Sequence, residues 1–277
     1  MSRSGLALAR QLIARGGDDF LVTGQALDSF GFDARAKSGL AVQQRVAGFE
    51  VTASAESGAA RLWDRDTLLA LRRGWREHGY DALSLSASRS LGPFFMSARA
   101  TRLAERETVL GALFDGALAA NGTHSWFADL EAQWTPAAHW SLSAAWRQGW
   151  TRLGAGGVRP TADHLRSTAW SFDATRWSLL CPDDRLSLRI AQPLRVSHGG
   201  LDLKLPVSYD YASLQTGFAT ERLNLAPTGR ERDIEAAYAR PLWGGQLSAN
   251  AYWRHEPGNF AAAPEDLGAA IRFSFGI

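Results

Sequence analysis

Histidine is the side chain best suited to acid–base chemistry near neutral pH, and this chain has six. They are His78, His124, His139, His164, His198 and His255. Two of them have an acidic neighbour, since Asp163 precedes His164 and Glu256 follows His255. One hypothesis is therefore a hydrolase site at the rim of the fold, and the other is a set of solvated loop histidines without a catalytic role.

The motifs that usually accompany catalysis are missing. The sequence has no Gly-x-Ser-x-Gly, no phosphate-binding loop and no His-Glu-x-x-His. Its single cysteine, Cys181, cannot form an internal disulfide or a cysteine-based metal site. We therefore predict a protein that is not an enzyme, with no catalytic residue, no cofactor and no metal.

Two smaller polar groups have structural explanations. Asp183 and Asp184 follow a proline, which is typical of a turn. Arg72, Arg73 and Arg76 form a basic patch that either faces solvent or meets the phosphates of lipopolysaccharide.

Charged residues also recur inside segments that otherwise alternate between apolar and polar positions. Because side chains of a strand alternate between its two faces, these charges share the polar face. We predict that they face the lumen of a barrel, where arginines and carboxylates can pair; in a soluble sandwich the same face would meet solvent. The predicted lumen-facing residues are Glu50, Arg99, Asp129, Glu131, Asp173, Arg189, Lys204 and Glu235.

The elements that carry these charges have a period of two from residue 46 to the end. The strands are predicted at 47–55, 83–88, 94–101, 126–134, 140–147, 170–175, 185–190, 201–210, 220–225, 233–238, 246–254 and 267–277. Most approach the length of roughly ten residues that a tilted membrane strand needs. The sequence predicts an all-β fold, a transmembrane antiparallel β-barrel of about 12 strands over residues 46–277.

Tryptophans mark the ends of several predicted strands, and the chain has eleven of them. Trp126 and Trp134 bracket one strand, and Trp140 and Trp146 bracket the next. Aromatic side chains gather at both membrane interfaces, so this spacing favours a bilayer.

The predicted connections alternate in length. Short ones lie at 89–93, 135–139, 181–184 and 242–245, and longer ones at 56–79, 102–123, 151–164, 226–232 and 255–266. A moderately long connection is predicted at 192–200, and stretches 65–77 and 104–119 have helical character. Outer-membrane barrels have short periplasmic turns and long outer loops, so the short set is assigned to the periplasm.

Residues 1–45 are predicted as a separate unit, a short helix and linker that fill the lumen. Residues 5–15 read as the helix, ended by Gly16 and Gly17, and Arg10 and Arg15 are expected to meet lumenal carboxylates. An ordinary surface helix is the alternative. Residues 18–45 fit either short strands or an extended linker.

The first residues do not read as a convincing signal peptide, because Arg10 and Arg15 interrupt the apolar run. We expect an export signal further upstream, in a longer precursor. The net charge of +2 gives no reason to expect nucleic acid as a partner.

The final strand alternates apolar residues with small or polar ones. Its apolar residues are Ala269, Ile271, Phe273, Phe275 and Ile277. Such a face suits contact with lipid, and we expect this strand to close the barrel against a first strand near Phe49–Ala55. The last strand of a soluble sandwich is the alternative.

The segments RLSLRIAQPLRV (185–196), GLDLKLPV (200–207) and RLNLAPTGRERDIEAAYARPL (222–242), followed by this strand, carry a family resemblance. They are similar to the C-terminal translocator barrel of bacterial autotransporters, most of all those that follow subtilisin-like (S8) serine protease passengers. The resemblance is clearest over 183–277. It departs from the family at Ile277, where the family usually ends on Phe.

The resemblance implies a type V secretion domain in the bacterial outer membrane. Its partners would be outer-membrane lipid and lipopolysaccharide, its own N-terminal passenger, and the barrel-assembly machinery, which recognises the final strand. Protease activity would belong to the passenger. A porin-like diffusion channel, a rim hydrolase and a soluble β-sandwich are the alternatives.

Arginine at apolar positions near the middle of the bilayer should destabilise the protein. We expect Leu130→Arg or Leu142→Arg to cost about 2–4 kcal/mol of folding free energy in lipid vesicles, and Glu131→Arg or Ser143→Arg to cost little. Reversible unfolding measures both sets, and equal costs on the two faces would refute the alternation.

Overall fold

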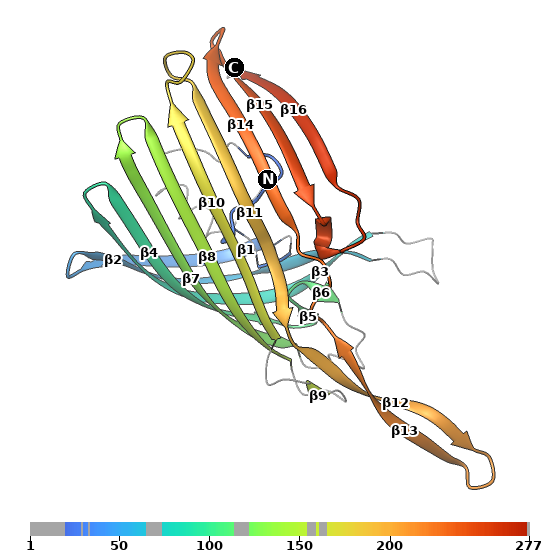
Figure 1. Cartoon of the computed structure of the whole chain (residues 1–277). Coiled ribbons are helices and arrows are strands. Elements are labelled where there is room, and N and C mark those ends of the chain that lie inside the picture. The colour runs from blue at the N-terminus through green and yellow to red at the C-terminus, as the bar shows by residue number, and fades with distance from the viewer. Residues whose placement is uncertain are drawn as a thin grey trace.

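The computed structural model describes residues 20–28, 30–32, 34–64, 74–113, 122–153, 159–160 and 165–275. The protein is all-β, as the sequence predicts, and its main body is one antiparallel sheet of eleven strands (Figure 1). In these parts of the chain, no helix has the length and apolar character required to cross a membrane.

The eleven strands follow one another as neighbours along the sheet, without crossovers. They are β1 (Ala34–Val46), β2 (Phe49–Asp64), β3 (Gly74–Leu91), β4 (Phe94–Glu105), β7 (Thr123–Ala137), β8 (Trp140–Leu153), β10 (Leu165–Trp177), β11 (Arg185–His198), β14 (Arg232–Leu242), β15 (Gly245–His255) and β16 (Asp266–Phe275). Because the order is a simple meander, alternate connections lie at opposite ends of the sheet.

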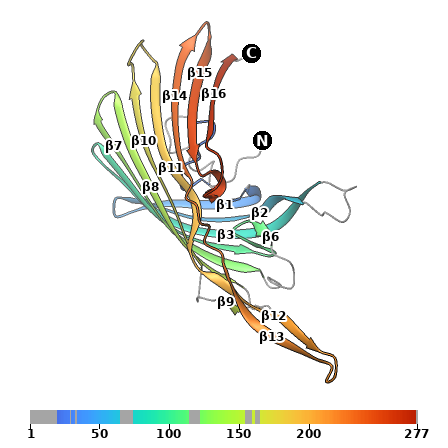
Figure 2. The same ribbon diagram turned by 45° about the vertical axis from the view of Figure 1, so that its right-hand side comes forward.

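The sheet is strongly curved. Figures 1 and 2 show β1–β3 crossing the hollow side at a steep angle to β14–β16. The right-handed twist between neighbouring strands accumulates over eleven strands, and register shifts in β1, β7 and β10 add local bends. The sheet therefore has a concave and a convex face.

The alternation predicted from sequence sorts the side chains onto these two faces. On the convex face Leu130 lies between Ala98 and Trp146, and its side chain is 53% exposed. Ile271 is 79% exposed. On the concave face the charged Asp129 and Arg147, which lie opposite each other, are buried. The convex face is thus mainly apolar, and the buried charges lie on the concave face.

The first strand differs from the prediction. Residues 34–46, assigned to the linker, pair with β2 along almost their whole length. The sheet thus begins near residue 34, not near 46. The polar sequence of this strand hid it, because Ser38 and Gln44 interrupt the apolar alternation that Leu40, Val42 and Val46 carry.

Two predicted barrel strands lie outside the main sheet. β12 (Gly200–Asp210) and β13 (Gln215–Asn224) form a hairpin that projects from it, and the short β9 (Arg159–Pro160) pairs with β12 (Figure 2). The predicted connection at 192–200 is also wrong, because β11 continues to His198. A break at Gly199 (φ +119°) then separates β11 from β12.

The connections fall into two groups, as predicted. Tight turns lie at 47–48, 92–93, 138–139, 178–184 and 243–244, at what we call the turn end of the sheet. The other neighbouring strands are joined at the opposite end, which we call the long-connection end: β2 to β3, β4 to β7, β8 to β10, β11 to β14 and β15 to β16.

The helical character expected in two long connections is not found where the structure describes them. Residues 74–77 already belong to β3, and β5 (Thr108–Val109) pairs with β6 (Ala112–Leu113). The 256–265 connection holds one 3₁₀ turn, η1 (Pro257–Asn259).

The closure predicted for the last strand is wrong in one respect. Phe49–Ala55 belongs to β2, which already has β1 and β3 as neighbours. Among the described residues, β1 and β16 each pair with one strand only. Both strands run from the long-connection end to the turn end.

The turn between β10 and β11 is organised by Asp184, as the Pro-Asp-Asp sequence predicts. Its buried carboxylate accepts hydrogen bonds from the backbone N–H of Leu179, Leu180 and Cys181 at 2.7–3.0 Å. Burial raises the pKa of Asp184, but the bonds from Leu180, Leu179 and Cys181 outweigh it, so the pKa lies below its usual value.

This turn should loosen in acid. Because the folded-state pKa of Asp184 is depressed, its contribution is complete above the unfolded-state pKa of about 3.9 and is lost as pH falls through the folded value. We expect the protection of the amides of residues 179–181 against hydrogen exchange, relative to the intrinsic rate at each pH, to fall as pH falls below about 4, and to be lower already at pH 7 in Asp184→Asn. Asp183→Asn is the control; if it loosens the turn equally, the carboxylate of Asp184 is not the cause.

Candidate functional site on the concave face

Residues 20–28 and 30–32, which we call the inner segment, lie on the concave face before the chain enters β1. The segment starts against β14, where Leu21 N is 2.7 Å from Glu235 Oε1. It then passes β10, where Ala26 N donates to Ser171 Oγ at 3.3 Å. It ends against β7 and β3, with Phe30 near Phe127 and Phe32 near Tyr80. Main chain that precedes the sheet therefore lies across its polar side.

The first ion pair beneath the inner segment joins β7 and β8. Arg147 Nε and Nη2 donate to the two carboxylate oxygens of Asp129, both at 2.7 Å. Both side chains are buried. The two residues are directly opposite in register, which allows this bidentate geometry. Arg147 Nη2 also reaches Leu27 O of the inner segment at 3.4 Å.

The second ion pair repeats this arrangement between β10 and β11. Arg189 donates to both oxygens of Asp173, at 2.7 and 2.8 Å, again across a directly opposed pair. Its Nη1 donates to Thr23 O at 2.8 Å. Each arginine thus binds a carboxylate of the sheet and a carbonyl of the inner segment.

Glu235 is the third carboxylate of the site, and it lies opposite Arg189 on β14. It is fully buried and accepts hydrogen bonds from the backbone N–H of Leu21, Val22 and Thr23 at 2.7–3.0 Å. Thr23 Oγ1 and Asn250 Nδ2 also donate to it, at 2.9 and 2.8 Å. Three successive amides on one carboxylate hold the inner segment by its main chain, whatever its side chains are.

Aromatic rings of the inner segment cover both arginines. The Arg189 guanidinium lies 4.1 Å from the centroid of the Phe20 ring. The Arg147 guanidinium lies 5.1 Å from the Phe30 ring and 5.0 Å from that of Phe127. Such contacts contribute roughly 0.5–2 kcal/mol each, more when water is excluded.

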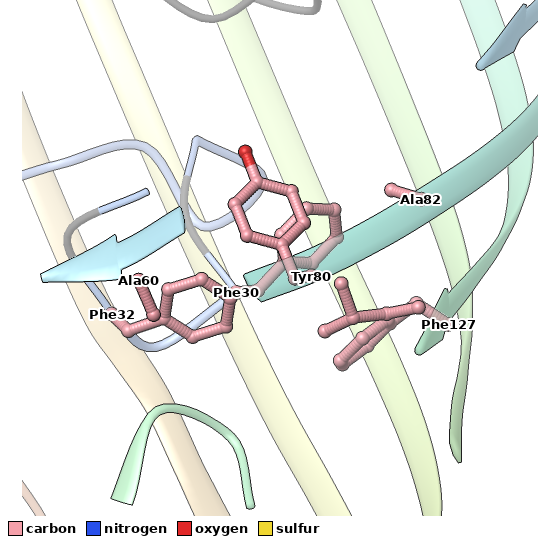
Figure 3. Packing of buried hydrophobic residues seen from close by; sticks show 7 residues of the cluster. Phe30, Phe32, Ala60, Tyr80, Ala82 and Phe127 are labelled. Atoms are coloured by element: carbon pink, nitrogen blue, oxygen red, sulfur yellow. The ribbon is translucent and has the colours of Figure 1, made fainter. Parts of the chain in front are cut away.

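The far end of the inner segment is anchored by an apolar cluster (Figure 3). The rings of Phe30 and Phe127 are 5.3 Å apart, and those of Phe32 and Tyr80 are 5.6 Å apart in an edge arrangement. Gly149 makes room for Phe127, since a Cβ there would come within 2.7 Å of its ring. Burying a Phe side chain contributes about 1.5–3 kcal/mol, so this cluster fixes the segment firmly.

A small hairpin made by β5 and β6 covers this end. Glu105 organises it, accepting hydrogen bonds from Leu110 N at 2.9 Å and Gly111 N at 2.8 Å. Gly111 has φ +77°, and a Cβ there would lie 2.3 Å from that of Phe32. Glycine is needed there for both reasons.

The charges of the site explain why the inner segment belongs to it. Two arginines face three buried carboxylates, Asp129, Asp173 and Glu235. A buried carboxylate without hydrogen bonds or a counter-charge is strongly unfavourable. Backbone amides of the inner segment supply the hydrogen bonds that the third carboxylate requires.

Four predicted lumen-facing residues meet in this site: Asp129, Asp173, Arg189 and Glu235. Arg99, on β4, is half-buried and lies opposite Asp129. Glu131 is also half-buried and lies two residues from Asp129 along β7, toward the turn end. Glu50 lies near the first turn and pairs with Arg45 at 3.0 Å. Lys204 is in β12, on the projecting hairpin and away from the main sheet.

The residues of the predicted assembly signal lie on β16 or just beyond it. Ala269, Ile271 and Phe273 are exposed on the convex face, opposite Ala251, Ala249 and Leu247. The backbone of Phe275 pairs with Gly245. Ile277 lies outside the described residues, as do the predicted helix at 5–15 and Arg10 and Arg15.

The histidines are spread over the molecule. His78, expected in a loop, lies in β3, and its buried Nδ1 is 2.5 Å from Glu107 Oε2. His124, His198 and His255 are at strand ends and His139 is in a turn, whereas His164 lies outside the described residues. In the described ranges, no three His, Cys, Asp or Glu side chains are grouped as metal ligands would be.

Sequence reasoning did not single out Arg147 or Ser171, and it placed residues 1–45 in the lumen without predicting which groups of the inner segment make the contacts. Arg147 falls on the polar face that the alternation predicts, so the pattern could have found it. The inner segment gives no periodic signal. Its role comes from backbone groups of residues 21–23, which side-chain patterns do not report.

The arrangement can bind an extended peptide by its main chain, through a carboxylate that accepts amides and guanidinium groups that donate to carbonyls. Comparison of the sequence with protein-family models and with curated proteins, and of the structure with solved structures, gives no match.

Removing the charge of Glu235 should release the start of the inner segment. A glutamine keeps the size but loses the charge-assisted bonds, which contribute about 1.5–3 kcal/mol each. We expect the amides of residues 21–23 to exchange hydrogen at least about tenfold faster in Glu235→Gln. Glu50→Gln, far from the segment, is the matched control; unchanged exchange in Glu235→Gln would show that the carboxylate does not hold the segment.

Proposed function

We propose that this chain is the translocator and membrane anchor of an autotransporter, an outer-membrane β-barrel that serves the secretion of an upstream passenger. The observation that carries the proposal is the inner segment. It directly precedes β1 and is bound along the polar concave face by Glu235, Arg189 and Arg147. A domain fused upstream would thus be tethered through the interior of the curved sheet.

The convex face supports a membrane location. Large apolar side chains are exposed on strands from one edge of the sheet to the other, among them Leu40, Leu85, Met96, Leu130 and Ile271. A continuous apolar face of this extent is unfavourable in water, and lipid is the solvent that suits it. Trp126 and Trp150 near the long-connection end, with Trp134 and Trp140 near the turn end, suit the two interfaces.

The two ends of the sheet support an orientation. Tight turns at one end and long connections at the other match the periplasmic and outer sides of such proteins. The resemblance of residues 183–277 to autotransporter barrels supports the same orientation. Insertion would depend on the barrel-assembly machinery, through the final strand.

Closure of the sheet follows from the membrane proposal, because unpaired strand edges are not tolerated in hydrocarbon. Eleven strands alternate in direction, so β1 and β16 would meet in parallel. One further strand between them would restore antiparallel order and give twelve. Either arrangement gives the backbone groups at the edges of β1 and β16 hydrogen-bonding partners.

A reporter tests the proposed function. An export signal and a small epitope are fused ahead of Met1, and the epitope is probed with antibody on intact bacteria. We expect surface exposure whenever the barrel gives a heat-modifiable band on gels, because a folded barrel resists cold detergent. An epitope that stays in the periplasm beside a folded barrel would contradict translocation.

The final strand provides the matched pair of variants for this experiment. Phe273→Asp puts a charge on the convex face and should abolish both the folded band and surface exposure. Ser274→Asp changes the neighbouring position on the concave face and should leave both intact. A folded, membrane-embedded Phe273→Asp protein would count against a lipid-facing β16.

A further inference from the structure

The convex face carries a row of basic and aromatic side chains near the long-connection end. In register, Arg102 of β4 lies opposite Trp126 of β7, Trp126 opposite Trp150 of β8, and Trp150 opposite Arg166 of β10. In the next row outward, His124 lies opposite Arg152. We call Arg102, His124, Arg152 and Arg166 the basic belt.

All four side chains of the basic belt are exposed. The convex positions of β4, β7, β8 and β10 contain no aspartate or glutamate. The convex-face acids on the neighbouring strand are Glu77 and Asp81, which lie 2.9 Å from Lys37 and 3.7 Å from Arg106 respectively. Within the part of the chain that the structure describes, neither Arg102 nor Arg152 forms an ion pair. Arg102 and Arg152 therefore give this surface positive charge.

The surface next to the belt is apolar. Further along the same strands, toward the turn end, the convex face presents Ala100, Leu130, Trp146 and Phe172. Trp126 and Trp150 stand within the belt itself, 53% and 36% exposed. A charged band, tryptophans and then an apolar face match the order of headgroup, interface and acyl chains in a lipid leaflet.

We propose that the basic belt binds the phosphate groups of a phosphorylated glycolipid, lipopolysaccharide, in the outer leaflet. The inference rests on the proposed function, because it requires the convex face to lie in an outer membrane. Guanidinium groups pair with phosphate through charge-assisted bonds. Neighbouring strands are about 4.8 Å apart, so Arg102 and Arg166 are about 14 Å apart and can reach different phosphates.

The position of the belt selects the outer leaflet. It lies at the long-connection end, whereas the inner leaflet would meet the turn end. At the turn end two convex-face arginines lie over aromatic rings, with Arg89 5.1 Å from the Phe49 ring and Arg176 5.0 Å from the Trp140 ring. These two arginines provide a control with the same change of charge on the same face.

The test compares R102S/R152S with R89S/R176S and the unchanged protein, each folded in detergent and verified by heat-modifiable mobility. Purified lipopolysaccharide is titrated, and the rise in Tm gives the apparent Kd. We expect the Kd of R102S/R152S to be at least about tenfold weaker, as the loss of two charge-assisted contacts implies. R89S/R176S should bind like the unchanged protein.

Three other additives identify the chemistry that is recognised: lipopolysaccharide stripped of phosphate, inorganic phosphate, and phosphatidylglycerol. None should raise Tm as intact lipopolysaccharide does. Equal stabilisation by phosphatidylglycerol or inorganic phosphate would overturn the assignment to the glycolipid, and equal binding by the stripped form would overturn the role of phosphate.

Failure of this inference is distinguishable from failure of the proposed function. A folded barrel that displays its epitope, but whose R102S/R152S variant binds lipopolysaccharide normally, contradicts the basic belt alone. If no variant gives a heat-modifiable band, both proposals fail. If R102S/R152S does not fold, R152S alone is compared with R89S. The single variant should change the logarithm of the Kd by about half as much as the double variant.

Discussion

The burial of carboxylates on the concave face is the constraint on which the interior depends. Asp129 and Asp173 each pair with a bidentate arginine, and the third buried carboxylate, Glu235, lies opposite Arg189. Its requirement for hydrogen bonds is met by amides of residues 21–23. The sheet and the segment in front of it are therefore one electrostatic unit.

The same interactions explain why the inner segment is extended. A carboxylate that accepts three successive amides, with Arg189 donating to the carbonyl of Thr23, uses main-chain groups that a helix would pair internally. Apolar contacts then fix the other end, where Phe30 and Phe32 pack against Phe127 and Tyr80. Polar recognition sets the conformation, and burial of aromatic rings supplies much of the stability.

The convex face of the same strands carries mainly apolar side chains, in contrast to the buried charges of the concave face. Because alternate side chains point to opposite faces, one sequence can place Asp129 inside and Leu130 outside at adjacent positions. The ion pairs and the apolar band thus share a single register, and a slip of one residue would exchange them. This coupling keeps the buried charges away from the apolar convex face.

The sequence sufficed for the all-β class, the two faces, the alternation of short and long connections and the side of the sheet on which Asp129, Asp173, Arg189 and Glu235 lie. Each of these follows from a period of two, which is a local property. Only the tertiary structure decided that β1 is a strand, that β12 and β13 leave the sheet, and that residues 21–23 complete the charged site. Those outcomes depend on pairing and backbone contacts between residues far apart in the chain, more than 200 positions for Thr23 and Glu235.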